Sequence, residues 1–323
     1  MADATAWCNG KIGTKGLSYA AHTQAALASL NPPGLAAMFL DCGGFSNAFR
    51  TGIRHGGAFE LKQATWAFNN GKASPAALSD PLIAKAMDTI DIRDWFTRMP
   101  WKRGHSPLQW VPEYEDYLIE QWTHGEFSDY WRQAGIYAEG FYDQYADVPM
   151  VHLSAWYDPY TRTATDNYTG LARRKRGPVR LILGPWTHGD RSSTYAGDVD
   201  FGPAATLDGS LAEDFHVLRL RWFDRWLRGI ENSVDSEPTV RYFVMGGGSG
   251  RRNADGRMDH GGRWREAADW PLPNAVSTPF YCHADGALSA SAPAAEQASL
   301  FLQLRPAQPR ADHRRTDLPP ACR

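Results

Sequence analysis

A serine, an aspartate and a histidine follow one another along the chain in an order that would suit acyl-transfer chemistry. The serine is Ser18, in the sequence GLSYA at residues 16–20. A strand-like run precedes it and a helical run follows, so its hydroxyl would lie on a sharp strand-to-helix turn, with a helix N-terminus near developing negative charge. Gly16 and Ala20 are small enough for such a crowded turn. The usual motif ends in Gly, however, and a serine before a helix more often acts only as a cap.

The candidates for acid and base follow two later apolar runs. Asp158 comes just after the run that ends at Trp156, and His188 comes just after PVRLILGPW. Parallel sheets carry their chemistry at the carboxyl ends of their strands, so these side chains would reach one edge together with Ser18. The carboxylate would orient the imidazole, which would accept the serine proton. Separately, Asp158 could be a turn carboxylate and His188 a loop histidine, but their order with Ser18 favours a catalytic triad.

Other candidate features have simpler explanations. His22 lies one helical turn after Ser18 and could line the site, although a packed helix histidine is the simpler interpretation. His152 lies in an apolar run and is expected to be a core residue with a hydrogen-bonded ring. The basic residues 173–176 are expected to form a solvated loop. Glycines 246–248 predict a β-turn, since no phosphate-loop helix and lysine follow. No spacing of His, Cys, Asp or Glu indicates a metal site.

The elements that must position the triad are strands and helices in alternation. Helices are predicted over residues 19–30 and 160–174, the first ended by NPPG. A third is predicted over 210–229, with Ser210 and Glu213 as a capping box and Gly229 at its end. Nearly continuous apolar strands between helices are typical of a parallel sheet covered on both faces, so the sequence predicts an α/β fold. The predicted strands comprise residues 11–16, 35–40, 148–156 and 178–183.

Two stretches depart from this alternation. Residues 44–145 are aromatic-rich and mostly helical in pattern, with helices predicted from residue 81, over 113–122 and over 127–134. After residue 237, alternating runs such as TVRYFVMG and Gly-rich turns predict an all-β domain. The chain has 13 Trp, 13 Tyr and 14 Phe. Packing inside the core and the helical stretch is the favoured explanation, ahead of a surface that binds aromatic or carbohydrate ligands.

Composition excludes several classes of protein. A length of 323 residues suggests about two domains. The 34 basic and 36 acidic residues leave a net charge of −2, which gives no reason to expect nucleic acid or an anionic membrane as a partner. The sequence contains no run of about 18 apolar residues, so it predicts no membrane span. The N-terminal residues do not have the pattern of a secretory signal. Four cysteines without CxxC spacing suggest reduced thiols and a cytoplasmic location.

Four motifs together resemble the CocE/NonD hydrolases, which include cocaine esterase, X-Pro dipeptidyl-peptidases and α-amino-acid ester hydrolases. They are GKIGTKGLSYAAHTQ at 10–24, WYD at 156–158, GPWTHG at 184–189 and RWFDRWLRG at 221–229. The resemblance implies a serine hydrolase that cleaves ester or amide bonds of small-molecule or peptide substrates without a cofactor. Ser18 matches the nucleophile, Asp158 the acid and His188 the base. Tyr19 matches the residue whose backbone N–H forms part of the oxyanion hole.

The resemblance also implies an architecture. It divides the chain into α/β-hydrolase core residues 1–43, an inserted helical cap at 44–145, further core residues 146–235, and a partial jelly-roll β domain with an irregular tail at 236–323. Only 17 residues precede Ser18, fewer than the strands and the oxyanion-hole tyrosine of this family need, and the strand pattern fades near residue 293. We therefore expect a family member truncated at both ends.

Two alternatives stay open at this point. One is a catalytically impaired remnant of the family, and the other is an aromatic-rich binding module. Exposed strand edges could also promote self-association into a homo-oligomer.

Overall fold

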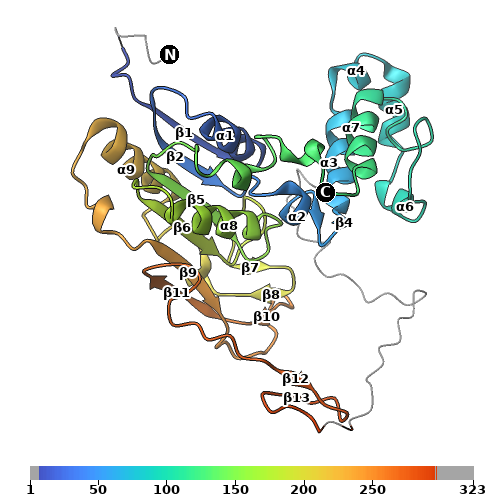
Figure 1. The fold of residues 1–323 in the computed structure, drawn as a ribbon. Coiled ribbons are helices and arrows are strands. Elements are labelled where there is room, and N and C mark those ends of the chain that lie inside the picture. The colour runs from blue at the N-terminus through green and yellow to red at the C-terminus, as the bar shows by residue number, and fades with distance from the viewer. Residues whose placement is uncertain (1–6, 295, 297–323) are drawn as a thin grey trace.

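The chain folds around a six-stranded sheet in the order β1-β2-β5-β6-β9-β11 (Figure 1). The computed structural model describes residues 7–294 and 296. Neighbouring strands from β1 to β9 pair in parallel, and only the pair of β9 and β11 within this sheet is antiparallel. The predicted α/β fold with a central parallel sheet is confirmed. The strands are β1 (Ile12–Leu17), β2 (Leu35–Asp41), β5 (Met150–Ala155), β6 (Val179–Gly184), β9 (Val240–Met245) and β11 (Gly262–Ala267).

Helices cover both faces of this sheet because its strands are apolar on both sides. Helices α1 (Tyr19–Ser29) and α8 (Thr161–Ala172) pack on one face, where their apolar residues cluster with Met38 and Leu40 of β2. Helix α9 (Phe215–Arg228) packs on the other, where Leu218 and Trp222 meet Phe39 of the same strand. Successive side chains of a strand point to opposite faces, so one apolar strand can contribute to both clusters.

Two predicted helices differ from the structure. The helix predicted from residue 210 begins only at Phe215, because Asp214 is its N-cap and accepts a hydrogen bond from the N–H of Val217 at 2.7 Å. Gly209 has a φ of +78°, which interrupts any earlier start. Gly229 ends the helix in the left-handed conformation, as predicted. In the predicted helix 127–134, only residues 129–132 form a short 3₁₀ turn.

The predicted cap region is mainly helical and lies to one side of the sheet in Figure 1. Its apolar side chains form their own cluster, which includes Phe68, Trp101 and Leu118. Asp80 caps α5 through its side chain, as the Asp-Pro pair suggested. The elements of this region are α2 (Ala48–Thr51), β3 (Arg54–His55), β4 (Ala58–Phe59), α3 (Leu61–Lys72), α4 (Pro75–Leu78), α5 (Pro81–Asp88), α6 (Ile92–Phe96), α7 (Pro112–Thr123), η1 (Asp129–Arg132) and η2 (Ala138–Phe141).

The two ends of this helical region run side by side and form a stem. Backbone hydrogen bonds join Ala138 N–H to the carbonyl of Phe45 at 3.1 Å and Glu139 N–H to that of Ser46 at 3.0 Å. A third joins the N–H of Ala48 to the carbonyl of Ile136 at 2.8 Å. The segment therefore leaves and re-enters the core at one place, between the adjacent parallel strands β2 and β5.

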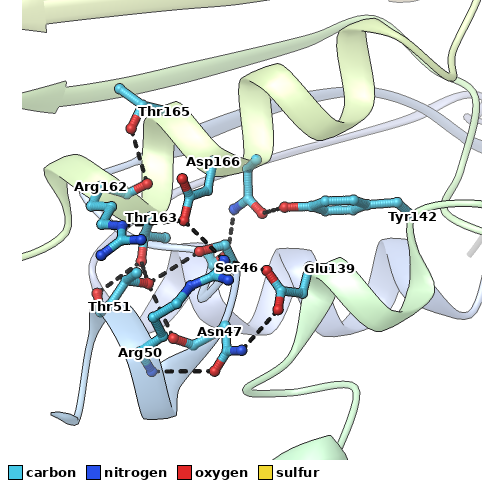
Figure 2. A network of polar contacts seen from close by, with 12 residues as sticks. Ser46, Asn47, Arg50, Thr51, Glu139, Tyr142, Arg162, Thr163, Thr165 and Asp166 are labelled. Carbon is cyan, nitrogen blue, oxygen red and sulfur yellow. Dashed lines mark hydrogen bonds and ion pairs between the residues drawn. The ribbon is translucent and has the colours of Figure 1, made fainter. Parts of the chain in front are cut away.

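A polar network anchors this stem to helix α8 (Figure 2). The hydroxyls of Thr51 and Thr163 are 3.1 Å apart, and both residues are fully buried. Nearer the surface, the guanidinium of Arg50 pairs with Glu139 at 2.5 Å and with Asp166 at 3.3 Å. Because α8 follows Asp158 directly in the chain, the network links the cap to the element beside the candidate acid.

The C-terminal part of the described chain holds shorter strands. Strands β9 and β11, which the sequence analysis assigns to the C-terminal β domain, extend the central sheet. The proposed domain boundaries stay predictions, and most of the predicted irregular tail lies outside the described residues. The remaining elements are β7 (Tyr195–Ala196), β8 (Val199–Asp200), η3 (Pro203–Ala205), η4 (Val234–Ser236), β10 (Met258–Asp259), β12 (Tyr281–Cys282) and β13 (Leu288–Ser289). None of the helices in the described residues is both long and apolar enough to cross a membrane.

Candidate active site

Ser18 lies on the sharp turn that the sequence predicts. It caps helix α1 with φ 58° and ψ −117°, a conformation that non-glycine residues rarely adopt. The turn has no room for larger neighbours. A Cβ at Gly16 would lie 2.4 Å from the Cβ of Ala20, and one at Gly43 would lie 2.6 Å from the carbonyl oxygen of Ser18. Alanine at position 20 therefore fits where the usual motif has glycine.

Backbone groups hold this turn and leave one donor available. The N–H of Ser18 donates to the carbonyl of Asp41, at the end of β2, at 2.9 Å. The carbonyl of Ser18 accepts from the N–H groups of Ala21 and His22. Among the described residues, the N–H of Tyr19 has no hydrogen-bond acceptor, as is usual in the first turn of a helix. A donor at this position can stabilise an oxygen that gains negative charge beside Ser18.

Asp158 and His188 meet beyond the carboxyl ends of β5 and β6. Nδ1 of His188 lies 2.6 Å from one carboxylate oxygen of Asp158. The second oxygen accepts a hydrogen bond from the N–H of Tyr160 at 2.6 Å, and the Asp158 side chain is fully buried. The carboxylate thus fixes the orientation of the ring, and Nε2 of His188 is left as the nitrogen that can exchange a proton with a hydroxyl.

A cavity of about 920 Å³ brings the predicted residues to one place. Ser18, Tyr19 and His188 line it from the core, and Asp158 lies behind His188. The cap lines the opposite side, so a bound molecule would be enclosed between the two regions. The cap residues in the lining are Phe45, Ile53, Lys62, Gln63, Thr65, Trp66, Asn69, Asn70, Tyr117, Gln121, Tyr130, Gln133, Gly135 and Ile136.

His22 both packs and lines this cavity. Its Nδ1 accepts the N–H of Gly44 at 2.9 Å, and its ring stacks on Phe45 with centroids 3.8 Å apart. Burial, and then the nearby Lys62 ammonium, lower the pKa of His22 to about 3, so the ring stays neutral. The two interpretations weighed for His22 are therefore compatible.

Three residues that sequence reasoning missed support or line the site. The guanidinium of Arg191 pairs with the carboxylate of Asp41, which ties the loop after His188 to the end of β2. Lys62, in the first turn of α3, carries an ammonium group into the lining of the cavity. No local sequence motif predicts that these residues belong to the site, because their contacts depend on how distant parts of the chain pack together.

Cys42 adds a thiol beside the candidate acid and base, at a place where no metal spacing was recognised. Its Sγ, a carboxylate oxygen of Asp158 and a ring nitrogen of His188 lie within 4.8 Å of one another. Burial, and then the Asp158 charge, raise the pKa of Cys42 well above its usual value. The thiol therefore keeps its proton, and since metals bind the thiolate, this set is poorly suited to a metal ion.

Comparison with protein families gives two matches. The family model of the X-Pro dipeptidyl-peptidases (S15 family) matches residues 2–190. The chain belongs to this family. A second model, of the X-Pro dipeptidyl-peptidase C-terminal non-catalytic domain, matches residues 232–316. The resemblance to the CocE/NonD hydrolases is confirmed, and the X-Pro dipeptidyl-peptidase family is one of hydrolases.

Individual relatives agree with this membership. Cocaine esterase of Rhodococcus sp. strain MB1 Bresler is 27% identical over 296 residues, which cover 88% of this chain and 47% of that protein. An aminopeptidase from a marine sediment Thaumarchaeota archaeon has a TM-score of 0.62 at 20% identity, covering 92% of this chain and 45% of the other. A CocE/NonD hydrolase of Staphylococcus aureus has a TM-score of 0.57 at 21% identity, with 89% and 40% covered. The chain thus spans less than half the length of these relatives.

Proposed function

We propose that this chain is a serine hydrolase that cleaves ester or amide bonds of small-molecule or peptide substrates through an acyl-enzyme. In this proposal Ser18 is the nucleophile, His188 is the general base and acid, and Asp158 orients His188. The observation that carries it is the 2.6 Å contact of Asp158 with Nδ1 of His188, at the wall of the cavity that Ser18 also lines. Membership in the X-Pro dipeptidyl-peptidase family supports the same reaction class.

The reaction proceeds in two halves. Oγ of Ser18 attacks the substrate carbonyl carbon while Nε2 of His188 takes the hydroxyl proton. The tetrahedral oxyanion accepts a hydrogen bond from the N–H of Tyr19. The bond to the leaving group then breaks, and His188 protonates the departing oxygen or nitrogen. Water repeats the sequence on the acyl-enzyme, releasing the acid and restoring Ser18.

Two further points belong to this proposal. Each step uses only side chains, backbone and water, so we propose that no cofactor takes part. We propose a cytoplasmic location because the cysteine pattern suggests reduced thiols, and Cys8 and Cys42 form no disulfide within the described residues. Self-association stays a prediction from the sequence.

A fluorophosphonate probe tests the proposal directly, since it reacts with activated serines. We expect labelling of the wild-type chain, loss of labelling in Ser18→Ala, and full labelling in the control Ser79→Ala, which changes a serine at the cap surface. The wild-type chain and Ser79→Ala should also hydrolyse p-nitrophenyl acetate, whereas Ser18→Ala should not. A folded wild-type protein that neither reacts with the probe nor hydrolyses any ester or amide would reject the proposal in favour of a non-catalytic family member.

A further inference from the structure

Lys62 places a cation in a cavity otherwise lined largely by aromatic and neutral polar side chains. Its Nζ donates to the carbonyl of Gly52 at 2.6 Å and lies 4.5 Å from the ring centroid of Tyr160. Within the described residues, no carboxylate oxygen lies within 4.0 Å of this ammonium group. Glu60, the N-cap residue of the same helix, has a carboxylate oxygen 3.1 Å from Nε2 of His55. The direct contacts of the Lys62 ammonium are therefore a carbonyl and an aromatic face, while Glu60 and Asp158 act on its charge from a greater distance.

This ammonium lies close to the reacting groups. The Tyr160 ring beneath it is 5.5 Å from the ring of His188 and 4.9 Å from that of His22, measured between centroids. All four residues line the cavity with Ser18. A substrate whose carbonyl reaches Ser18 can therefore extend one of its ends to Lys62 within the same cavity.

Burial away from water makes the charged form of Lys62 energetically unfavourable. Binding of an anion beside the ammonium would offset part of that free energy. Burial lowers the pKa of Lys62 to about 8, against the opposing effect of Glu60 and Asp158. An ammonium has three donors, and one is used on Gly52. A carboxylate that entered the cavity could accept from the remaining donors as a charge-assisted hydrogen bond, the stronger kind.

Building on the proposed hydrolase function, we propose that Lys62 is a specificity-determining residue that selects substrates whose acyl chain ends in a carboxylate. The substrate class is the monoester or monoamide of a short dicarboxylic acid. A substrate with a protonated amino group in the acyl part would meet the like charge of Lys62 and be disfavoured. Asp198 also lines the cavity, but it is exposed, so its charge is screened by water.

Matched esters that differ only in charge test this selection. The anionic ester is p-nitrophenyl hydrogen glutarate and its neutral counterpart is p-nitrophenyl methyl glutarate. Alanyl-proline p-nitroanilide, an amide with a different leaving group, serves as a separate cationic substrate that is compared only between variants. We expect the wild-type kcat/KM for the anionic ester to exceed that for the neutral one by about 10- to 100-fold, the range of one hydrogen bond to a charged group. Lys62→Met should remove this preference, because kcat/KM should fall much more for the anionic ester than for the neutral one. It should also raise turnover of the cationic substrate.

Lys72→Met is the matched control, because Lys72 is on the same helix but pairs with Asp88 at 2.7 Å outside the cavity. It should keep the wild-type preference for the anionic ester.

The pH dependence of this preference in the wild-type chain provides a second test that needs no variant. The preference should be largest between about pH 6 and pH 7, where the substrate carboxyl group is ionised and Lys62 is protonated, and it should fall as the pH rises through about 8, where Lys62 loses its charge. The groups that face Lys62 or act on the same cluster are Glu60, His55, His22, Tyr160, Asp158, His188 and Arg162.

The outcomes separate the two proposals. Equal hydrolysis of the anionic and neutral esters by the wild-type chain, or an equal loss of both in a folded Lys62→Met variant, would overturn the role of Lys62 and leave the hydrolase standing. Absence of any hydrolysis and of fluorophosphonate labelling would instead reject the hydrolase proposal itself. If Lys62→Met does not fold, the wild-type substrate ratio and its pH profile still decide.

Discussion

At the scale of single residues, the backbone conformation of Ser18 limits which residues can stand beside it in the turn. Its positive φ costs on the order of 1–3 kcal/mol, and the turn is retained because surrounding groups hold it. A methyl group at Gly16 or Gly43 would overlap atoms of the turn, so neither position has room for a side chain. The sequence motif reflects this crowding, which explains why a weak pattern identified the turn correctly.

Gly16→Ala should therefore disrupt the candidate nucleophile. Its Cβ would lie 2.4 Å from the Cβ of Ala20, so the turn must shift. We expect kcat/KM for p-nitrophenyl acetate to fall at least 10-fold and the melting temperature to drop by several degrees. Gly125→Ala is the control, since a Cβ there meets no atom within 4 Å and its φ is not positive. Equal effects of the two substitutions would contradict this explanation.

Asp158→Asn tests the orienting carboxylate. The amide keeps the shape of the side chain but stabilises the imidazolium poorly and favours the wrong tautomer of His188. We expect kcat/KM to fall by about 10³–10⁴, with little change in fold by circular dichroism. Asp190→Asn, beside the same loop, should stay within 3-fold of wild type, because Asp190 is hydrogen-bonded to Ser193. A fall of less than 10-fold in Asp158→Asn would remove Asp158 from the proposed triad.

Residues with a local signature could be predicted from the sequence, and those without one could not. Ser18, Asp158 and His188 each follow a recognisable strand, so their order predicted a shared edge. Lys62 reads as an ordinary surface lysine, and its place in the cavity depends on how the cap packs against the core. His152 was correctly expected to be buried, but its ring has no hydrogen-bond partner among the described residues, contrary to the prediction.

At the scale of elements, the first four strands of the sheet and several helices were predictable to within a few residues, whereas helix α3 was not predicted separately. Helix α9 shows why ends are harder. Ser210 and Glu213 have the spacing of a capping box, but Asp214 stands directly before Phe215 and caps the helix instead. Competing caps differ by little energy, about 1 kcal/mol, so surrounding packing selects between them.

The polar network in Figure 2 makes an element-scale prediction. Thr163→Val removes a buried hydroxyl that contacts Thr51 and donates to its backbone carbonyl at 3.2 Å. We expect a loss of about 1–2 kcal/mol in the free energy of unfolding, measured with urea. Thr165→Val, two residues along α8, removes a partly exposed hydroxyl that bonds only within its own helix. It should cost less than 0.5 kcal/mol by the same principle. Reversal of that order would show that the network does not stabilise the stem.

At the scale of the whole molecule, the parallel topology was predictable, whereas the pairing partners of the later strands were not. Alternation after residue 237 indicated strands, but alternation alone does not specify a neighbour. The pairing of β9 with β6 joins Leu181 to Val240 across an interval that contains α9, so it depends on tertiary contacts.

The buried histidines make stability depend on pH. Burial lowers the pKa of His152 to about 3, below the value near 6.5 in the unfolded chain. The unfolded state therefore binds the proton more tightly, and stability is lost as the pH falls from about 6.5 toward 3. Between pH 7 and pH 5 this one residue should cost about 2 kcal/mol. His22 acts in the same direction.

Urea unfolding of His152→Leu at both pH values measures this effect. The variant should lose about 2 kcal/mol less stability than wild type between pH 7 and pH 5. Ser154→Ala changes another buried residue of β5 that carries no titrating group, so its effect should be the same at both pH values. An identical pH response of His152→Leu and wild type would contradict the assignment of acid sensitivity to His152.

The hydrogen-bonded stem at residues 45–48 and 136–139 has a consequence for how proteins of this family can diversify. Because the two ends of the insertion are held together, lengthening or replacing the segment between them changes the loop-closure free energy only slightly, by about 0.6 kcal/mol for each doubling in length. The reacting groups stay at the edge of the sheet, while about half of the residues that line the cavity belong to the insertion. New substrate preferences can therefore arise by exchanging one contiguous segment, and a cap grafted at these residues from a relative should carry its selectivity with it.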